Sequence, residues 1–383
     1  MLPSAPNTQS QPLTAIGLMS GTSLDGVDVA LLRSDGEDVI EAGPTLSVPY
    51  PRMTKVWVQR AIKAALEGRS EANEIANAID EVTSAHIRAV QKFMEKHHLV
   101  RKEIDVIGFH GQTILHRPPI DRSAPGRTWQ IGSGQIMAEE LGINVVDGFR
   151  LNDMAQGGEG APFAPVYHAV LVRKLDRKHP VCVLNIGGVA NVTWIPTDGD
   201  PMKMVAFDCG PGNGLVDQWV DFQTGERMDK DGAYAAAGEV QDEVLRLMLL
   251  NPYLRRKPPK SLDRYDFKID HIKEMSTQDG AATLTAFTAA CIERSVSLLP
   301  AAPGEWIVVG GGGHNPVLMA EIRDRLAAPV MLASDAGWRG DFLEAECFAY
   351  LAVRSLRKLP LSYPGTTRIN RPLTGGMLHT KPV

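Results

Sequence analysis

The segment GLMSGTSLDGVDVALL, residues 17–32, restricts the fold of this chain more than any other segment. In it an apolar strand stops at a turn rich in small residues, and a second apolar strand begins directly afterwards. Gly21 and Gly26 allow positive φ angles and a close approach of the backbone. The segment therefore predicts a β-hairpin whose turn has the geometry that phosphate-binding loops need.

The same turn carries hydroxyls and carboxylates. Ser20, Thr22 and Ser23 supply the hydroxyls beside the backbone N–H groups of the bend. Asp25 and Asp28 add carboxylates that are able to order Mg²⁺ or its water. Ordinary β-hairpins also place glycine and aspartate in their turns, so this segment alone leaves a plain hairpin and a phosphate site both open.

The size and composition of the chain predict a soluble protein of two domains. A chain of 383 residues with 44% hydrophobic content exceeds the usual size of a single core. No apolar stretch approaches the roughly 18 residues of a membrane helix. The N-terminus has neither the basic nor the apolar region of a signal peptide, so residues 1–12 are expected to be a disordered tail on a cytoplasmic protein.

Cysteine spacing and net charge argue against a zinc site, a disulfide framework and a nucleic-acid partner. The four cysteines lie far apart without a C-x-x-C pair, which favours reduced, buried thiols over a zinc site or a disulfide framework. The formal net charge of −5 argues against nucleic acid as a partner. The dense basic stretch, Arg255 to Lys260, contains two prolines and is interpreted as a solvated loop, with a substrate-facing lid as the alternative.

Hydrophobic periodicity predicts an α/β chain. Residues 15–48 have the pattern of a three-strand meander, and helical spacing follows over residues 82–98. The short apolar run 104–109 predicts a buried strand that ends at His110-Gly111-Gln112-Thr113. Polar residues at the end of a buried strand are where α/β folds place their ligands.

A second hairpin pattern appears in VCVLNIGGVANVTWI, residues 181–195. Two such hairpins about 165 residues apart suggest an internally duplicated architecture with a cleft between the halves. A later strand, residues 306–309, runs into four glycines, 310–313, which leave room for a flat ligand. A flexible turn is the alternative, because a lone glycine cluster is a weak signal.

The two hairpins and the late GGGGHN resemble the phosphate-1, phosphate-2 and adenosine elements of the sugar kinase, heat-shock chaperone and actin superfamily. More narrowly, the chain resembles the anhydro-N-acetylmuramic acid kinases. The motifs that carry this second resemblance span residues 17–352: MSGTSLDGVD, GFHGQTILHRP, DGFRLNDMAQGGEGAPFAP, LNIGGVANVTWI, FDCGPGN and LEAECFAYLA. Two departures stand out, namely Glu159 where many relatives have Gln, and Ser261-Leu262-Asp263-Arg264 in place of Ser-Thr-Gly-Arg.

The resemblance implies two ribonuclease-H-like α/β domains of the actin-like ATPase type, flanking a central cleft. Residues 13–165 plus 356–383 would form the first domain, and residues 166–355 the second. The implied enzyme opens 1,6-anhydro-N-acetylmuramic acid with water and phosphorylates O6 from ATP, giving N-acetylmuramic acid 6-phosphate and ADP. In this reaction the freed ring oxygen attacks the γ-phosphate, so no separate general acid is required.

Two carboxylates are the candidate catalytic residues. Water attacking an oxocarbenium-like carbon needs a carboxylate base, and the family match assigns this role to Asp208. Asp208 follows the apolar run 204–207 and opens the predicted turn 208–213. Glu344, on the LEAECFAYLA helix, is the second candidate. An aspartate that accepts hydrogen bonds in its own turn and a glutamate in a helix's first turn are the structural alternatives.

At the predicted nucleotide site, the protein has to position ATP and neutralise the charge of its phosphates. The candidate ATP-binding residues are Gly21, Thr22, Ser23, Leu24, Asp25, Gly26, Val27, Asp28, Gly187, Gly188, Asn191, Gly311, Gly312 and Asn315. Asp25 is the candidate side chain for Mg²⁺, through water, with Asp28 as its alternative. Mg²⁺ keeps several waters and takes few protein ligands.

The amino sugar is expected to contact His110, Gln112, Thr113, Arg150 and Asp153. The Arg150 guanidinium suits the lactyl carboxylate of the sugar, and a salt bridge to Asp147 or Asp153 is the alternative. His110 and His116 are six residues apart without further ligands nearby, so a metal pair is not favoured.

Other functions stay open at this point. A nucleotide-switched ATPase like actin or a chaperone would need a protein-binding surface, a kinase of another sugar would share the fold, and a glycosidase without ATP would leave the glycine-rich hairpins unexplained. The resemblance also implies a homodimer.

Overall fold

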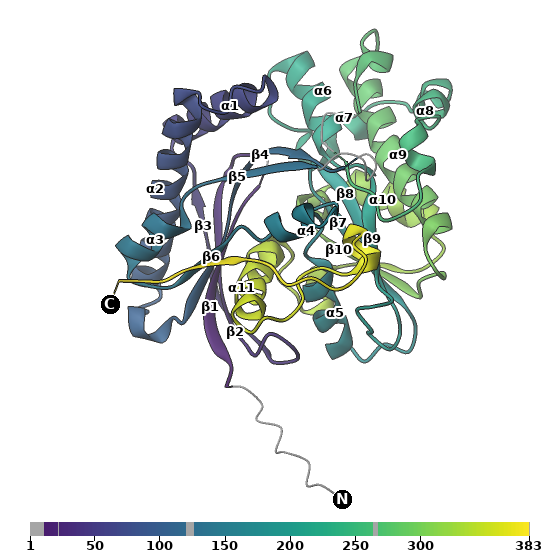
Figure 1. The fold of residues 1–383 in the computed structure, drawn as a ribbon. Coiled ribbons are helices and arrows are strands. Elements are labelled where there is room, and N and C mark those ends of the chain that lie inside the picture. Colours follow the sequence, from purple (N-terminus) through teal and green to yellow (C-terminus); the bar gives the residue numbers. More distant parts are fainter. Residues whose placement is uncertain (1–10, 22, 120–125, 263–266, 383) are drawn as a thin grey trace, which may run out of the picture.

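A computed structural model of the chain describes residues 11–21, 23–119, 126–262 and 267–382. Residues 1–10 of the predicted tail, Thr22, and the pair Asp263-Arg264 lie outside these ranges. The described chain forms two lobes, each built on its own β-sheet (Figure 1).

The first sheet has the strand order β12-β6-β4-β1-β2-β3, with β5 paired to β4. Its strands are β1 (Leu13–Ser20), β2 (Gly26–Ser34), β3 (Ile40–Pro49), β4 (Val106–Arg117), β5 (Arg127–Ile131), β6 (Val145–Asp147) and β12 (Met377–His379). The first three form an antiparallel meander, as the sequence predicted, and β4 lies parallel to β1.

The second sheet has the order β11-β10-β7-β8-β9. Its strands are β7 (Val181–Ile186), β8 (Val189–Ile195), β9 (Val205–Pro211), β10 (Glu305–Val309) and β11 (Val330–Leu332). An antiparallel meander again precedes strands parallel to its first member. The order β3-β2-β1-β4-β6 therefore recurs as β9-β8-β7-β10-β11, which confirms the duplication and the expected pair of ribonuclease-H-like α/β units.

Helices form the other layers. They are α1 (Arg52–Leu66), α2 (Asn73–Lys96), α3 (Gly134–Leu141), α4 (Leu151–Ala155), α5 (Pro165–Lys174), α6 (Gly214–Thr224), α7 (Ala233–Ala236), α8 (Asp242–Met248), α9 (Thr277–Ser295), α10 (Pro316–Arg325), α11 (Leu343–Leu356) and α12 (Pro364–Thr367). Several have side-chain caps: Ser133 accepts from the Ile136 N–H at the start of α3, and Ser276 does so from Asp279 at α9.

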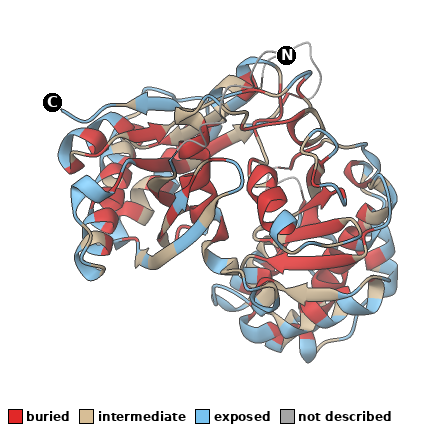
Figure 2. Ribbon diagram, turned by 90° about the horizontal axis from the view of Figure 1, so that it is seen from below, coloured by how far each residue is buried: buried red, intermediate tan, exposed pale blue. Residues whose placement is uncertain are grey.

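The apolar clusters show how these layers stack. Helices α1, α2 and α3 cover one face of the first sheet, and α9 and α10 cover the outer face of the second (Figure 1). Helices α5 and α11 lie between the two sheets and share one core with both of them. Figure 2 shows the buried residues running along both sheets and through the helices that pack on them.

Helix α11 contacts the first sheet through backbone. A Cβ on Gly17 of β1 would overlap the Ala345 carbonyl oxygen, and one on Gly108 of β4 would overlap that of Phe348. Glycine at these two positions is thus required by the close approach of the helix. α11 was assigned to the second domain, yet it packs on the first sheet. The domain limits themselves stay a prediction.

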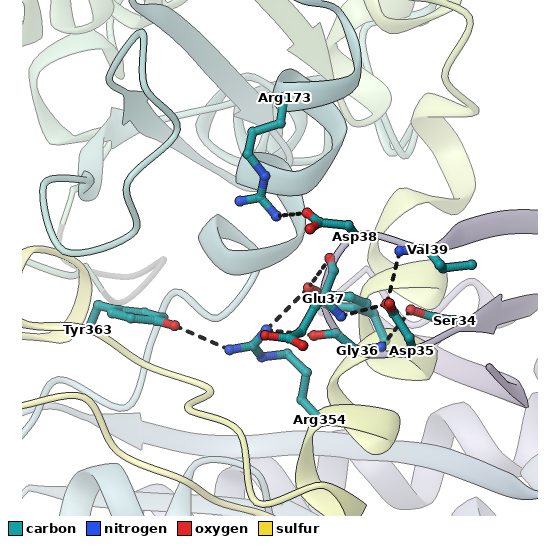
Figure 3. A network of polar contacts seen from close by, with 10 residues as sticks. Ser34, Asp35, Gly36, Glu37, Asp38, Val39, Arg173, Arg354 and Tyr363 are labelled. Carbon is teal, nitrogen blue, oxygen red and sulfur yellow. Dashed lines mark hydrogen bonds and ion pairs between the residues drawn. The ribbon is translucent and has the colours of Figure 1, made fainter. Parts of the chain in front are cut away.

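The β2–β3 turn is fixed to the C-terminal half of α11 by a polar network (Figure 3). Arg354 donates to the carbonyl oxygens of Gly36, at 2.6 Å, and Pro360, at 2.7 Å, and to the hydroxyl of Tyr363. From α5, Arg173 forms an ion pair of 2.8 Å with Asp38 at the end of the same turn. The turn therefore joins elements from both halves of the chain.

Two predicted strand ends are wrong. β4 does not stop at residue 109 but continues to Arg117, because its residues from Gln112 onward pair with β5, past a register shift at which Gly111 has a φ of 75°. β9 runs to Pro211, because Val189 of β8 pairs with Pro211. Asp208 therefore lies within a strand rather than opening a turn.

The prediction for the cysteines is confirmed, and the one for the basic stretch is partly wrong. The four cysteines are free and buried, as predicted. Arg255, Arg256 and Lys257 are exposed, but Lys260 is buried, which corrects the interpretation of that stretch as wholly solvated. Among the described helices, none combines the length and apolar character that a membrane span requires.

Candidate active site

Three polar side chains form a row across the second sheet. Asn185 pairs with Asn191, and Asn191 pairs with Asp208, so their side chains lie on the same face. All three are partly exposed, whereas the residues on either side of Asn185 and Asp208 are buried. Glu344, in the first turn of α11, extends this row because its Oε1 accepts a hydrogen bond of 3.3 Å from Asn185 Nδ2. We call Asp208, Asn191, Asn185 and Glu344 the polar row.

Asp208 is held on both sides by the segment 260–262. The Leu262 N–H donates to its Oδ2 at 2.7 Å, and its own N–H donates to the Lys260 carbonyl at 3.0 Å. Burial raises the pKa of Asp208 to about 7, and the charges of Lys260 and Arg150 oppose this rise. A carboxyl with a pKa near neutrality is suited to accept and release a proton.

Glu344 is open to solvent at the other end of the polar row. Desolvation by the surrounding protein still raises its pKa, against the opposing charge of Arg150. Arg150 acts electrostatically on both Glu344 and Asp208. The two predicted catalytic carboxylates therefore share one guanidinium.

His110 and Arg150 contact each other, as expected for residues of one site. His110 Nε2 accepts from Arg150 at 3.1 Å, and its Nδ1 donates to the Gly111 carbonyl at 2.7 Å. Burial and the neighbouring guanidinium hold the pKa of His110 well below its usual value, so the ring is neutral. Arg150 also donates to the Gly160 carbonyl at 2.7 Å, and His379 rather than Arg150 is the partner of Asp147.

The remaining predicted sugar residues have partners within the protein. Asp153 is buried, and its two oxygens accept from the Gly160 N–H at 2.8 Å and the Thr367 hydroxyl at 2.6 Å. Gln112 is buried and donates to the Gly21 carbonyl at 3.2 Å, while Thr113 accepts from Gln130. Gln112 thus supports the first hairpin turn directly.

That first turn leaves its backbone accessible. A Cβ on Gly21 would meet only Ser23 Oγ, at 3.7 Å, whereas one on Gly26 would overlap the β3 backbone. Leu24 has a φ of 59° and donates to the Gly21 carbonyl at 3.2 Å. The turn is therefore tight at Gly26 and open at Gly21.

Carboxylates gather beside this turn. Asp25 is exposed and lies 4.0 Å from Arg227, and Asp28 accepts from the Ser47 hydroxyl. Burial raises the pKa of Asp28, with smaller contributions from Asp341 and Asp25. In the described part of the chain no three His, Cys, Asp or Glu residues are placed to hold a metal among themselves. This arrangement fits a hydrated Mg²⁺ bound with phosphate, not a cage of protein ligands.

The second turn, Gly187-Gly188, packs against the start of α6. The N–H groups of Gly212 and Asn213 donate to the carbonyls of Gly188, at 3.0 Å, and Gly187, at 2.8 Å. Beyond β10, Gly311 has open space around it and Gly312 packs on Ile186. Asn315 caps α10, since its Oδ1 accepts from the N–H groups of Val317 and Leu318.

Two polar residues of the site were not among the predicted ones. Asn185 and Asn191 lie at equal distances along the chain on either side of Gly188 and pair with each other, and this symmetry is the signal that would have found Asn185. Lys260 gave no such signal in its basic, proline-rich context. Its Nζ donates to the Tyr253 carbonyl at 3.0 Å, and burial lowers its pKa to about 8.

The chain was compared with known proteins. The family model described as anhydro-N-acetylmuramic acid kinase matches residues 13–381. Relatives of that name include proteins of Zymomonas mobilis, at 45% identity over 96% of this chain and 100% of the relative, and Nitrobacter winogradskyi, at 46% over 97% and 100%. A third, from Rhizobium johnstonii, is 47% identical over 96% and 98%.

Solved structures give weaker likenesses. The activator of 2-hydroxyisocaproyl-CoA dehydratase from Clostridium difficile, with bound ADPNP, aligns at 13% identity and a TM-score of 0.44 over 90% of this chain and 96% of that one. Because this TM-score is below 0.5, the likeness supports no conclusion about function. The family match and the relatives of 45–47% identity over almost their whole length show that the chain belongs to the anhydro-N-acetylmuramic acid kinase family.

Proposed function

We propose that this protein opens 1,6-anhydro-N-acetylmuramic acid with water and phosphorylates O6 from ATP, giving N-acetylmuramic acid 6-phosphate and ADP. Family membership supports the reaction. The single observation that carries its assignment to this site is the polar row, in which strand register places Asp208, Asn191 and Asn185 side by side and a hydrogen bond joins Asn185 to Glu344.

Asp208 is proposed as the base that takes a proton from the attacking water. The water oxygen bonds to C1, the C1–O6 bond breaks, and its electron pair stays on O6. O6 then attacks the γ-phosphorus of ATP, and ADP leaves. A pKa of about 7 lets Asp208 accept the proton at neutral pH and release it to solvent afterwards.

Glu344 is proposed to orient the water or a sugar hydroxyl from the opposite end of the polar row. Its hydrogen bond with Asn185 fixes the carboxylate, and Arg150 favours its charged form. We propose that Arg150 also meets the lactyl carboxylate of the sugar, with the neutral His110 holding the guanidinium in place.

For ATP we propose the two hairpin turns and the glycine run after β10. The open backbone at Gly21 and Gly311 supports phosphate and adenosine contacts there. Asp28 and Asp25 are proposed to hold Mg²⁺ through water, because Asp28 lies among carboxylates whose mutual repulsion a cation would relieve. When bound, Mg²⁺ neutralises phosphate charge during transfer.

The setting of the reaction is also a proposal. Free, buried cysteines are consistent with the reducing cytoplasm, where we place the enzyme in recycling of cell-wall sugars. A homodimer is proposed from the family resemblance alone.

The test incubates the enzyme with ATP, Mg²⁺ and 1,6-anhydro-N-acetylmuramic acid in ¹⁸O-labelled water and analyses the product by mass spectrometry. We expect sugar 6-phosphate carrying ¹⁸O at C1 from the wild type and none from Asp208→Asn. ATP hydrolysis that is independent of the sugar, with no phosphosugar, would contradict the proposal and favour a nucleotide-switched ATPase.

A further inference from the structure

Glu159 is a fully buried carboxylate that the proposed mechanism does not use. It lies in the segment after α4, and its Oε2 accepts a hydrogen bond of 2.8 Å from the Ser261 hydroxyl. Its Oε1 lies 3.0 Å from Arg368 Nη2 in an ion pair. Three segments that are distant in the sequence therefore meet at this one side chain.

Ser261 connects Glu159 to the proposed base. The residue before it, Lys260, accepts the Asp208 N–H at 3.0 Å, and the residue after it, Leu262, donates to Asp208 Oδ2 at 2.7 Å. The backbone on both sides of Ser261 thus holds Asp208, while the Ser261 hydroxyl between them is bound to Glu159. A displacement of Ser261 would move both contacts of Asp208.

Glu159 also acts through its charge. A buried carboxylate is a strong source of field, and here it is balanced by the Arg368 guanidinium on its other side. After burial, Glu159 is the largest contribution that raises the pKa of Asp208. The side chain therefore bears on Asp208 both mechanically and electrostatically.

We propose that Glu159 is a positioning residue for Asp208: through Ser261 it fixes the 260–262 segment that holds the base, and its charge, balanced by Arg368, sets the field at that carboxylate. The inference rests on the proposed role of Asp208. Glu159 thereby helps to set the pH at which Asp208 becomes an active base.

The test is the pH dependence of kcat/KM for the anhydro sugar at saturating ATP. Glu159→Gln keeps the size and a hydrogen-bonding oxygen but removes the negative charge. This change favours ionised Asp208, so the acid limb of the profile should move down by about 0.5–1 pH unit. Activity at pH 5.5 relative to pH 8 should rise severalfold.

A second variant gives a shift of the opposite sign. Ser261→Ala keeps the Glu159 charge but releases the segment whose Leu262 N–H stabilises the Asp208 carboxylate. Its acid limb should move up by about 0.5 pH unit, with a lower kcat. This side chain is small, so the variant tests the proposal even where Glu159→Gln folds poorly.

Glu305→Gln is the matched control. Glu305 is also buried and ion-paired, at 2.6 Å to Arg177, but it begins β10 opposite Val181, at the other end of β7 from Asn185. Its acid limb should stay at the wild-type position, whatever stability it loses.

The outcomes separate the two proposals. Wild-type turnover that Asp208→Asn abolishes, combined with unmoved limbs in folded Glu159→Gln and Ser261→Ala, overturns the positioning role and leaves the proposed function intact. Absence of sugar-dependent turnover in the wild type overturns the proposed function itself.

Discussion

At the scale of single residues, the desolvated carboxyl of Asp208 lowers the free energy of unfolding at neutral and higher pH. Asp208 has a pKa of about 7 in the native protein, because it is desolvated, against about 4 in an unfolded chain. Between these pH values the native state binds more protons than the unfolded state, so the free energy of unfolding falls as the pH rises. The penalty is complete above pH 7 and absent below pH 4.

Asp208→Asn should therefore stabilise the protein while abolishing turnover. We expect its melting temperature to exceed that of the wild type by roughly 1–4 °C at pH 8, and by much less at pH 5. Differential scanning calorimetry at both pH values measures the effect. A variant that is less stable at pH 8 than at pH 5, relative to wild type, would show that the Asp208 carboxylate is not desolvated.

Two glutamates at positions i and i+2 of α11 should behave in opposite ways. Glu344 is open to solvent and belongs to the polar row, whereas Glu346 is buried against Arg339, at 2.7 Å, and the Tyr167 hydroxyl, at 2.7 Å. Glu344→Gln should lower kcat at least tenfold with little change in stability. Glu346→Gln should cost about 1–3 kcal/mol in urea denaturation and keep most of the kcat. The reverse pattern would exclude Glu344 from the site.

Site residues were predictable where the chemistry of the reaction requires a particular side chain. The contacts of a side chain were less predictable where tertiary packing determines them. Asp208, Glu344, His110 and Arg150 could be named from motifs, and the structure brings them together. The partners of Asp153 could not, because Thr367 is distant in the sequence. Which neighbours occupy a carboxylate depends on tertiary contacts that local patterns do not encode.

At the scale of elements, the contact of α11 with β1 and β4 determines how the first sheet is covered. Gly17→Ala places a methyl group against the Ala345 backbone, which can move only with the helix. We expect a loss of more than 3 kcal/mol in the free energy of unfolding by urea denaturation, or failure to fold.

Gly21→Ala is the control for this glycine, because its Cβ would meet only Ser23 Oγ at 3.7 Å. It should retain wild-type stability within about 1 kcal/mol and raise the KM for ATP, since the proposed phosphate turn loses its bare backbone. Equal destabilisation by the two substitutions would mean that helix contact is not what restricts Gly17.

Strand boundaries were the least predictable feature at this scale. Hydrophobic runs located β4 and β9 but ended both too early, since His110 and Asp208 are polar residues inside strands. Hydrogen bonding to β5 and β8 extends each strand past its apolar part. A polar residue that a functional site requires inside a strand interrupts the hydrophobic pattern from which the strand is predicted.

At the scale of the whole molecule, the duplicated sheet order was foreshadowed by two similar hairpins, whereas the backbone contact of α11 with β1 and β4 was not. Both halves contribute to the candidate site: His110 comes from β4 of the first sheet and Asp208 from β9 of the second. Closing the lobes over both substrates would exclude bulk water from the γ-phosphate.

We therefore expect a non-hydrolysable ATP analogue together with the anhydro sugar to reduce the radius of gyration, about 21 Å for a compact chain of this length, by on the order of 1 Å. Small-angle X-ray scattering measures this change, and the sugar alone is the control. Identical scattering curves with and without both ligands would rule out closure as part of the cycle.

The position of α11 also has a consequence for biosynthesis. Residues 13–147, which supply most of the first sheet, leave the ribosome roughly 200 residues before α11 does. Until then, the glycine-lined face of that sheet has no helix to cover it. Arg368, the counter-charge of Glu159, emerges later still. The first sheet therefore cannot acquire the cover that α11 gives it until most of the chain has been translated.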